Sequence, residues 1–99
     1  MVARALILGL LAACAGPSPV VDHVAVAPSP VPGHVRVTGT LLNRAGAGSV
    51  ELHVELRGKT LIRADKMIDV HEHEQVELAI DVAAQPGDYT ATIEPEYPN

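Results

Sequence analysis

Cysteine and large aromatic residues are scarce in this chain. Its 99 residues include one cysteine, two tyrosines, no tryptophan and no phenylalanine. A single cysteine excludes a disulfide bond within the chain and a zinc cage built from thiolates. The length allows one domain at most. Any core must therefore be built from Val, Leu, Ile and Ala.

Positive charge and catalytic motifs are also scarce. The chain has 7 basic and 12 acidic residues, for a net charge of −5, and no basic cluster that would hold a phosphate backbone. There is no Gly-x-Ser-x-Gly elbow, and the glycines at 46 and 48 do not open a helix as a dinucleotide-binding loop would. We therefore expect neither nucleic-acid binding nor enzymatic activity.

The N-terminus has the layout of a secretory signal segment. Arg4 precedes a short apolar run, ALILGLL, which leads into Ala12, Ala13 and Cys14. The run is far shorter than the roughly 20 residues that span a bilayer. The stretch Leu11-Ala12-Ala13-Cys14 resembles the lipobox of bacterial lipoproteins. The alternative is an ordinary signal peptide with a cysteine near its end.

This resemblance implies a processing route and a location. Residues 1–13 would be a cleaved signal peptide, and Cys14 would carry lipid on its thiol. Several acyl chains on one residue hold a protein on a membrane more firmly than one chain does. Residues 14–19, rich in Pro and small residues, would form a short tether. We expect a location in the cell envelope, at the outer membrane facing the periplasm in a Gram-negative host, because Ala15 is not the Asp linked to inner-membrane retention.

Residues 20–99 are dominated by strand-like alternation. Apolar residues recur at every second position in three long runs: Val35 to Leu41, Val50 to Leu56, and Val76 to Val82. Shorter runs surround Val24 and Val26, cover residues 60–64 and 67–70, and follow Tyr89. Six or seven strands without an amphipathic helix predict an all-β fold, a single small antiparallel immunoglobulin-like β-sandwich.

Glycine and proline positions predict local features of these strands. Gly39, inside a strand, predicts a β-bulge or a close approach of backbones. Gly58 and Lys59 predict a two-residue hairpin with a type II′ turn. Pro86 and Gly87 predict a type II turn before the last strand.

The stretches "VRVTGTLLNRAGAG" and "PGDYTATIE" resemble small immunoglobulin-like modules of bacterial envelope proteins, of the FxLYD and CARDB types. Gly39 and Asn43 match a strand end before a glycine turn, and Pro86, Gly87 and Tyr89 match a turn that opens a late strand. The core tryptophan and the aromatic-Leu-Tyr motif are missing. The sequence also departs from these modules in ending soon after the Tyr89 strand, so we expect either that a final strand is absent or that the first strand fills its edge. Tyr89 is either a tyrosine corner, bonded to upstream backbone, or a core-edge tyrosine.

One short motif has the spacing of metal ligands. In an extended segment, the imidazoles of His71 and His73 would lie on one side, about 6.6 Å apart, and could bind Zn²⁺ or Cu²⁺. Glu74 or Glu51 would add an oxygen ligand, and His53 a third imidazole if its strand is a neighbour. The alternative is a solvated hairpin, which binds no metal.

These observations leave three functions open. The first is a non-enzymatic structural or protein-interaction module, anchored to the membrane through Cys14 and lacking any cofactor besides its lipid. The second is a periplasmic metal-binding protein that uses His71, His73 and His53. The third is an inhibitor-type binder of a secreted enzyme, which would present the loops at residues 28–33, 43–49 and 83–88.

Overall fold

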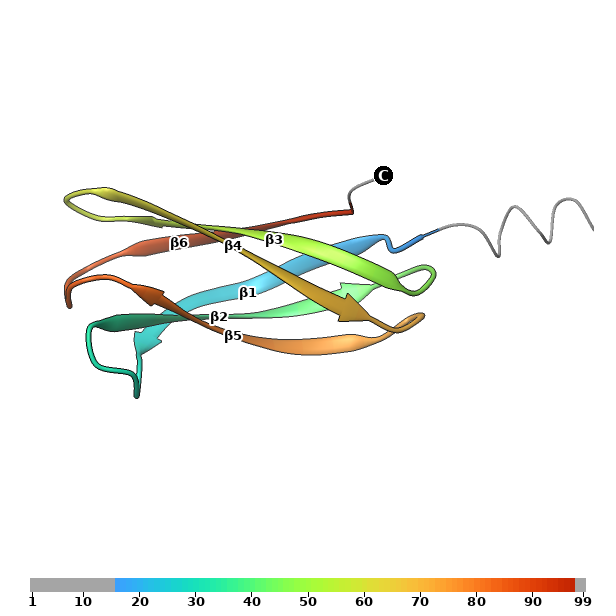
Figure 1. Ribbon diagram of the computed structural model, residues 1–99, viewed down its shortest axis with the longest axis horizontal. Helices are drawn as coiled ribbons and strands as arrows, with labels where there is room; N and C mark the ends of the chain where they lie inside the picture. The colour runs from blue at the N-terminus through green and yellow to red at the C-terminus, as the bar shows by residue number, and fades with distance from the viewer. Residues whose placement is uncertain (1–15, 98–99) are drawn as a thin grey trace, which may run out of the picture.

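Six β-strands make up the part of the chain that the structure describes. The computed structural model describes residues 16–97, and these form no helix (Figure 1). The strands are β1 (Pro19–Pro28), β2 (His34–Asn43), β3 (Gly48–Arg57), β4 (Leu61–Val70), β5 (Gln75–Ala83) and β6 (Thr90–Glu96). The predicted all-β fold is confirmed.

The strands form two antiparallel sheets that pack face to face. One sheet has the order β1-β2-β5 and the other the order β4-β3-β6. This order matches strands A, B and E of an immunoglobulin-type sandwich in one sheet and C′, C and F in the other. Within residues 16–97 there is no counterpart of a seventh strand. The edge strand β1 lies beside β6 without pairing with it (Figure 1).

The core consists of aliphatic side chains from the facing sides of the two sheets. Alternate residues of β2, β3 and β5 point inward, as their sequence pattern predicts. Leu41, Leu52 and Leu56 are completely buried, and Ile93 of β6 is buried with them. The chain therefore builds its core without Trp or Phe, through matched rows of Val, Leu and Ile.

The loops gather at two opposite ends of the sandwich (Figure 1). At the end where the described chain begins, called here the N-terminal end, residues 16–18 meet the turns at 44–47 and 71–74, and the Gly46 N–H donates to the Gly16 carbonyl at 3.2 Å. At the distal end, the loops at 29–33, 58–60 and 84–89 meet, and the Ala84 N–H donates to the Gly33 carbonyl at 3.1 Å. The candidate binding loops at 28–33 and 83–88 thus share one end, and the loop at 43–49 lies at the other.

The predicted close approach at Gly39 is confirmed, and the bulge lies on the neighbouring strand. Gly39 pairs regularly with Leu78, whereas the register of β1 against β2 shifts between Asp22 and Ala25. His23, inside this shift, has a left-handed backbone with φ of 55°. A Cβ atom at Gly39 would lie 3.3 Å from Ile93 and 3.4 Å from the Asp22 carbonyl. Glycine leaves room for the bulged strand and for the opposite sheet.

The two short strands predicted at 60–64 and 67–70 are one strand, β4. The sequence pattern breaks at Asp65 and Lys66, which occupy consecutive positions of a continuous ladder opposite His53 and Leu52. Lys66 takes an inward-facing position, but β4 is an edge strand and Lys66 is exposed there. An inward charge at an edge does not break a strand, and it blocks pairing with another chain.

Two turn predictions are wrong in type. Gly58 does not have the positive φ of a type II′ turn, and three residues, 58–60, connect Arg57 to Leu61. A Cβ at Gly58 would lie 2.9 Å from the Asp88 carbonyl, so the glycine is needed for space. Gly87 also lacks the positive φ of a type II turn. That arrangement occurs instead at Pro32 and Gly33, where Gly33 has φ of 72° and the His34 N–H donates to the Val31 carbonyl.

Candidate functional site

His71 and His73 lie in a tight turn rather than in an extended segment. Residues 71–74 connect β4 to β5, and the Glu74 N–H donates to the His71 carbonyl at 3.2 Å. The Glu74 carboxylate accepts from the His71 N–H at 2.9 Å, and His73 has a left-handed φ of 56°. The period-two geometry on which the predicted ligand pair was based is therefore absent from this turn.

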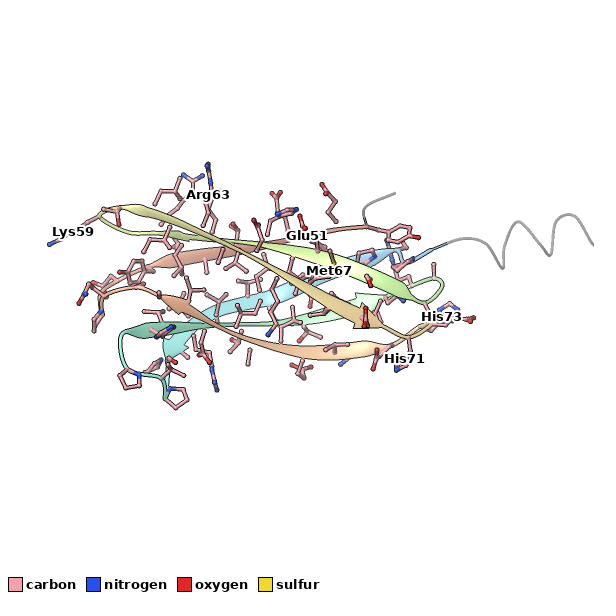
Figure 2. All side chains as sticks on the ribbon, in the orientation of Figure 1. Glu51, Lys59, Arg63, Met67, His71 and His73 are labelled. Carbon is pink, nitrogen blue, oxygen red and sulfur yellow. The ribbon has the colours of Figure 1, made fainter. Side chains whose placement is uncertain are left out.

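The structure also separates His53 from this turn. On β3, His53 pairs with Asp65 of β4, whereas Val70, the last residue of β4, pairs with Gly48. Five residues of extended strand separate these two positions, which corresponds to about 16 Å. Figure 2 shows Glu51 on the outer face of the β4-β3-β6 sheet and His71 and His73 at the turn. The three histidines proposed as one ligand set do not meet.

His53 instead lies among carboxylates from all three strands of its own sheet. Its Nδ1 is 2.7 Å from Asp65 Oδ1 of β4, and its Nε2 is 3.1 Å from Glu51 Oε1 of β3. The same Nε2 is 3.8 Å from Glu96 Oε1 of β6. Register explains the cluster, because Glu96 is directly opposite Glu51 and Asp65 is directly opposite His53. We call these four residues the His53 cluster.

The carboxylates of the His53 cluster favour the charged imidazole. The hydrogen bond with Asp65 raises the pKa of His53 most, and the charges of Glu51, Asp65 and Glu96 add to this rise, while desolvation opposes it. Sequence reasoning named His53 and Glu51 but missed Asp65 and Glu96. Asp65 lies on β4 and Glu96 on β6. The alternation of residues within a strand does not show which strands pair, so it could not place these two carboxylates beside His53.

The outer face of the other sheet carries an ion pair at its distal end. Arg36 of β2 donates from Nε and Nη2 to both oxygens of Asp81 of β5, at 2.9 and 3.0 Å. The Ser29 hydroxyl donates to Asp81 at 2.7 Å. The hydrogen bonds from Arg36 and then Ser29 lower the pKa of Asp81 from 3.8 to about 2. This triad ties the β1–β2 loop to the sheet.

Asn43 connects three chain segments at the N-terminal end of the sandwich. Its side chain is completely buried, and its Oδ1 accepts from the N–H groups of Ser18 and Ala45. Its Nδ2 donates to the Gly46 carbonyl at 2.9 Å and to the His71 carbonyl at 2.8 Å. Residue 18 of the predicted tether is thereby fixed to the domain, and Pro19 already pairs with Asn43 in β1.

The distal end has a shallow hollow and a tyrosine corner. Residues of the β1–β2 loop, among them Val31 and Pro32, line a hollow of about 420 Å³ together with Pro86 and Gly87.

The Tyr89 hydroxyl donates to the Gln85 carbonyl at 2.5 Å, so the predicted bond to upstream backbone is present. The Pro86–Gly87 bend is held by this bond.

Comparisons of the chain with protein families, with curated proteins and with solved structures found no match. Within residues 16–97, no helix is long and apolar enough to cross a membrane. Cys14, the predicted lipidation site, lies outside the described residues.

Proposed function

We propose that this chain is a lipid-anchored protein of the bacterial cell envelope and that its β-sandwich binds another protein with the distal end. The observation that carries this proposal is that residues 16–18 lie at the end of the sandwich opposite the distal loops (Figure 1). A domain held through Cys14 would present the loops at 29–33, 58–60 and 84–89 away from the membrane. The lipobox-like stretch at residues 11–14 supports the anchor.

The composition of the distal end favours a protein partner. Val31 is 40% exposed at the tip of the β1–β2 loop, and Pro28, Pro32 and Pro86 line the hollow beside it. Prolines restrict the backbone, so these loops lose little conformational entropy when a partner orders them. A small apolar surface on stiff loops, carried by a rigid scaffold, is suited to protein recognition without catalysis.

Metabolic labelling with palmitate tests the anchor. We expect the wild-type chain and a Ser18→Ala control to incorporate label and to sediment with membranes. The Cys14→Ala variant should incorporate none and should leave the membrane fraction. Equal labelling or equal sedimentation of Cys14→Ala would contradict the proposed anchor.

Site-specific photocrosslinking in intact cells tests the binding end. A photoreactive amino acid at position 31 should give a discrete crosslinked product with one envelope protein. The same amino acid at Arg44, an exposed residue in a turn of the N-terminal end, serves as the matched control. Products of the same mass and yield from both positions, or a product from position 44 alone, would contradict distal binding.

A further inference from the structure

We propose that Glu51, His53 and Glu96 bind a divalent transition-metal ion, with Asp65 as the residue that positions the imidazole. One atom from each of the three ligands, an imidazole nitrogen or a carboxylate oxygen, lies within 4.8 Å of the other two. A first-row metal bound at 2.0–2.2 Å in tetrahedral geometry separates its ligand atoms by about 3.4 Å. The distances from His53 Nε2 to Glu51 and Glu96, 3.1 and 3.8 Å, lie on either side of that value.

Asp65 fixes the orientation that a metal ligand requires. Its carboxylate binds Nδ1 of His53 at 2.7 Å, so Nδ1 keeps its proton and Nε2 faces the two glutamates. Carboxylate–histidine–metal arrangements of this kind are common, because the outer carboxylate fixes the tautomer and raises the basicity of the ligating nitrogen. A metal ion at Nε2 would have three protein ligands and an open position for water.

The charge around Nε2 also favours a cation. Glu51 and Glu96 are direct cross-strand neighbours, and like charges in that position destabilise a sheet. Among the described residues, the salt bridges of Glu51, Glu96 and Asp65 all involve the same partner, His53. By contrast, Glu55, the next outward carboxylate of β3, pairs with Arg57 and Arg63. Three carboxylates thus share a single imidazole, and a divalent ion would balance them.

The combination of ligands indicates the class of metal. Imidazole favours zinc, copper, nickel or iron, whereas magnesium and calcium favour sites made only of oxygen ligands. Because the ligands come from β3 and β6, the bound ion would also fasten β6, a seven-residue edge strand, to its neighbour.

Zinc titration followed by calorimetry tests the site. The sample is the untagged full chain in detergent micelles, with Cys14→Ser in every variant so that no thiol contributes. We expect one zinc ion per chain, no saturable binding in His53→Ala, and at least tenfold weaker binding in Glu51→Gln. Asp65→Asn should weaken binding 10- to 100-fold, as the loss of an outer-shell carboxylate does. Each variant is first checked by circular dichroism for its β-sheet spectrum.

Two controls separate this site from other sources of affinity. Glu55→Gln removes a carboxylate from the same face of β3 and should leave zinc binding unchanged. The double variant His71→Ala/His73→Ala should also bind normally. If one of the variants of the His53 cluster does not fold, hydrogen exchange of the wild-type protein tests whether zinc binds at this cluster. Zinc should slow amide exchange in β6 and not in β1.

The proposal is overturned by any of three results of the titrations. These are no saturable binding at about 100 μM zinc, unchanged binding in folded Asp65→Asn and Glu51→Gln variants, or loss of binding in the His71/His73 variant. Equal protection of β1 and β6 by zinc would also contradict it.

Discussion

The side-chain amide of Asn43 donates a 2.8 Å hydrogen bond to the main-chain carbonyl of His71, 28 residues later in the sequence. This bond joins the end of β2 to the turn between β4 and β5, and it therefore connects the two sheets at the N-terminal end of the sandwich. The same amide serves Ser18, Ala45 and Gly46, so one buried side chain satisfies four main-chain groups.

Replacement of Asn43 should destabilise the whole domain. Asn43→Ala removes the partner of four partly buried main-chain groups. An unsatisfied group costs about 1–3 kcal/mol when it is fully buried, so we expect a total loss of about 3 kcal/mol in the free energy of unfolding. Urea denaturation followed by circular dichroism measures the loss. Arg44→Ala, at the adjacent exposed position, is the control and should change stability little. Equal midpoints for the two variants would show that Asn43 does not hold this end together.

Two glycines near Tyr89 should respond oppositely to a methyl group. A Cβ at Gly58 would lie 2.9 Å from the Asp88 carbonyl and from the Tyr89 ring, whereas the nearest atom at Gly87 is 3.7 Å away. Gly58→Ala should therefore cost about 1–3 kcal/mol through overpacking. Gly87→Ala should be neutral or slightly stabilising, because alanine reduces the entropy of the unfolded chain. Thermal unfolding of both variants compares them directly, and a stable Gly58→Ala would refute the close approach.

The tyrosine corner predicts a modest and specific loss. Tyr89→Phe removes the hydroxyl that donates to the Gln85 carbonyl and keeps the ring, so we expect a loss of about 1 kcal/mol in the free energy of unfolding. Hydrogen exchange should accelerate in residues 84–89 before it does so in the strands. Unchanged exchange in that loop would mean that the hydroxyl does not hold the bend.

The Arg36–Asp81 ion pair predicts a stability change in acid. The folded pKa of Asp81 is about 2, below its ordinary value of 3.8, because Arg36 and Ser29 donate to the carboxylate. The unfolded chain therefore takes up a proton first as the pH falls. The stabilisation from this carboxylate is fully present above about pH 4 and is lost as the pH falls towards 2.

Melting temperatures measured from pH 7 to pH 2 test this dependence. Asp81→Asn should melt lower than the wild type at pH 7, and the difference should shrink towards pH 2. Glu77→Gln, an exposed variant four residues earlier on β5, should show a smaller difference at neutral pH. A difference between Asp81→Asn and the wild type that stays constant down to pH 2 would contradict the lowered pKa.

The sequence predicted the regular strands because their signal is local. Alternation in β2, β3 and β5 matches their inward and outward faces residue by residue. It failed at Lys66, where an edge position admits a charge on the inward face. In β1 the alternation predicted for residues 23–26 is confirmed, but it does not reveal the bulge between Asp22 and Ala25. A glycine in the sequence does not reveal why it is needed. Gly58 is required because a side chain would have no space, and Gly33 because its backbone is left-handed.

The candidate sites were less predictable because they depend on strand pairing. His53 and Glu51 are two residues apart and could be recognised as a pair on one face. Glu96 joins them only because β6 pairs with β3, and Asp65 only because β4 pairs on the other side. The spacing of His71 and His73 predicts a metal-ligand pair only if the segment is extended. The segment is a turn instead, stabilised by the hydrogen bond from the His71 N–H to the Glu74 side chain and by the left-handed backbone of His73.

The anchor at Cys14 is the central claim, and the intact mass of the protein extracted from membranes of its own host tests it most directly. We predict a chain that begins at Cys14 and carries the added mass of a diacylglyceryl group, with or without a further acyl chain on the amino group. A mature protein recovered from the medium with a free, unmodified thiol would contradict the account.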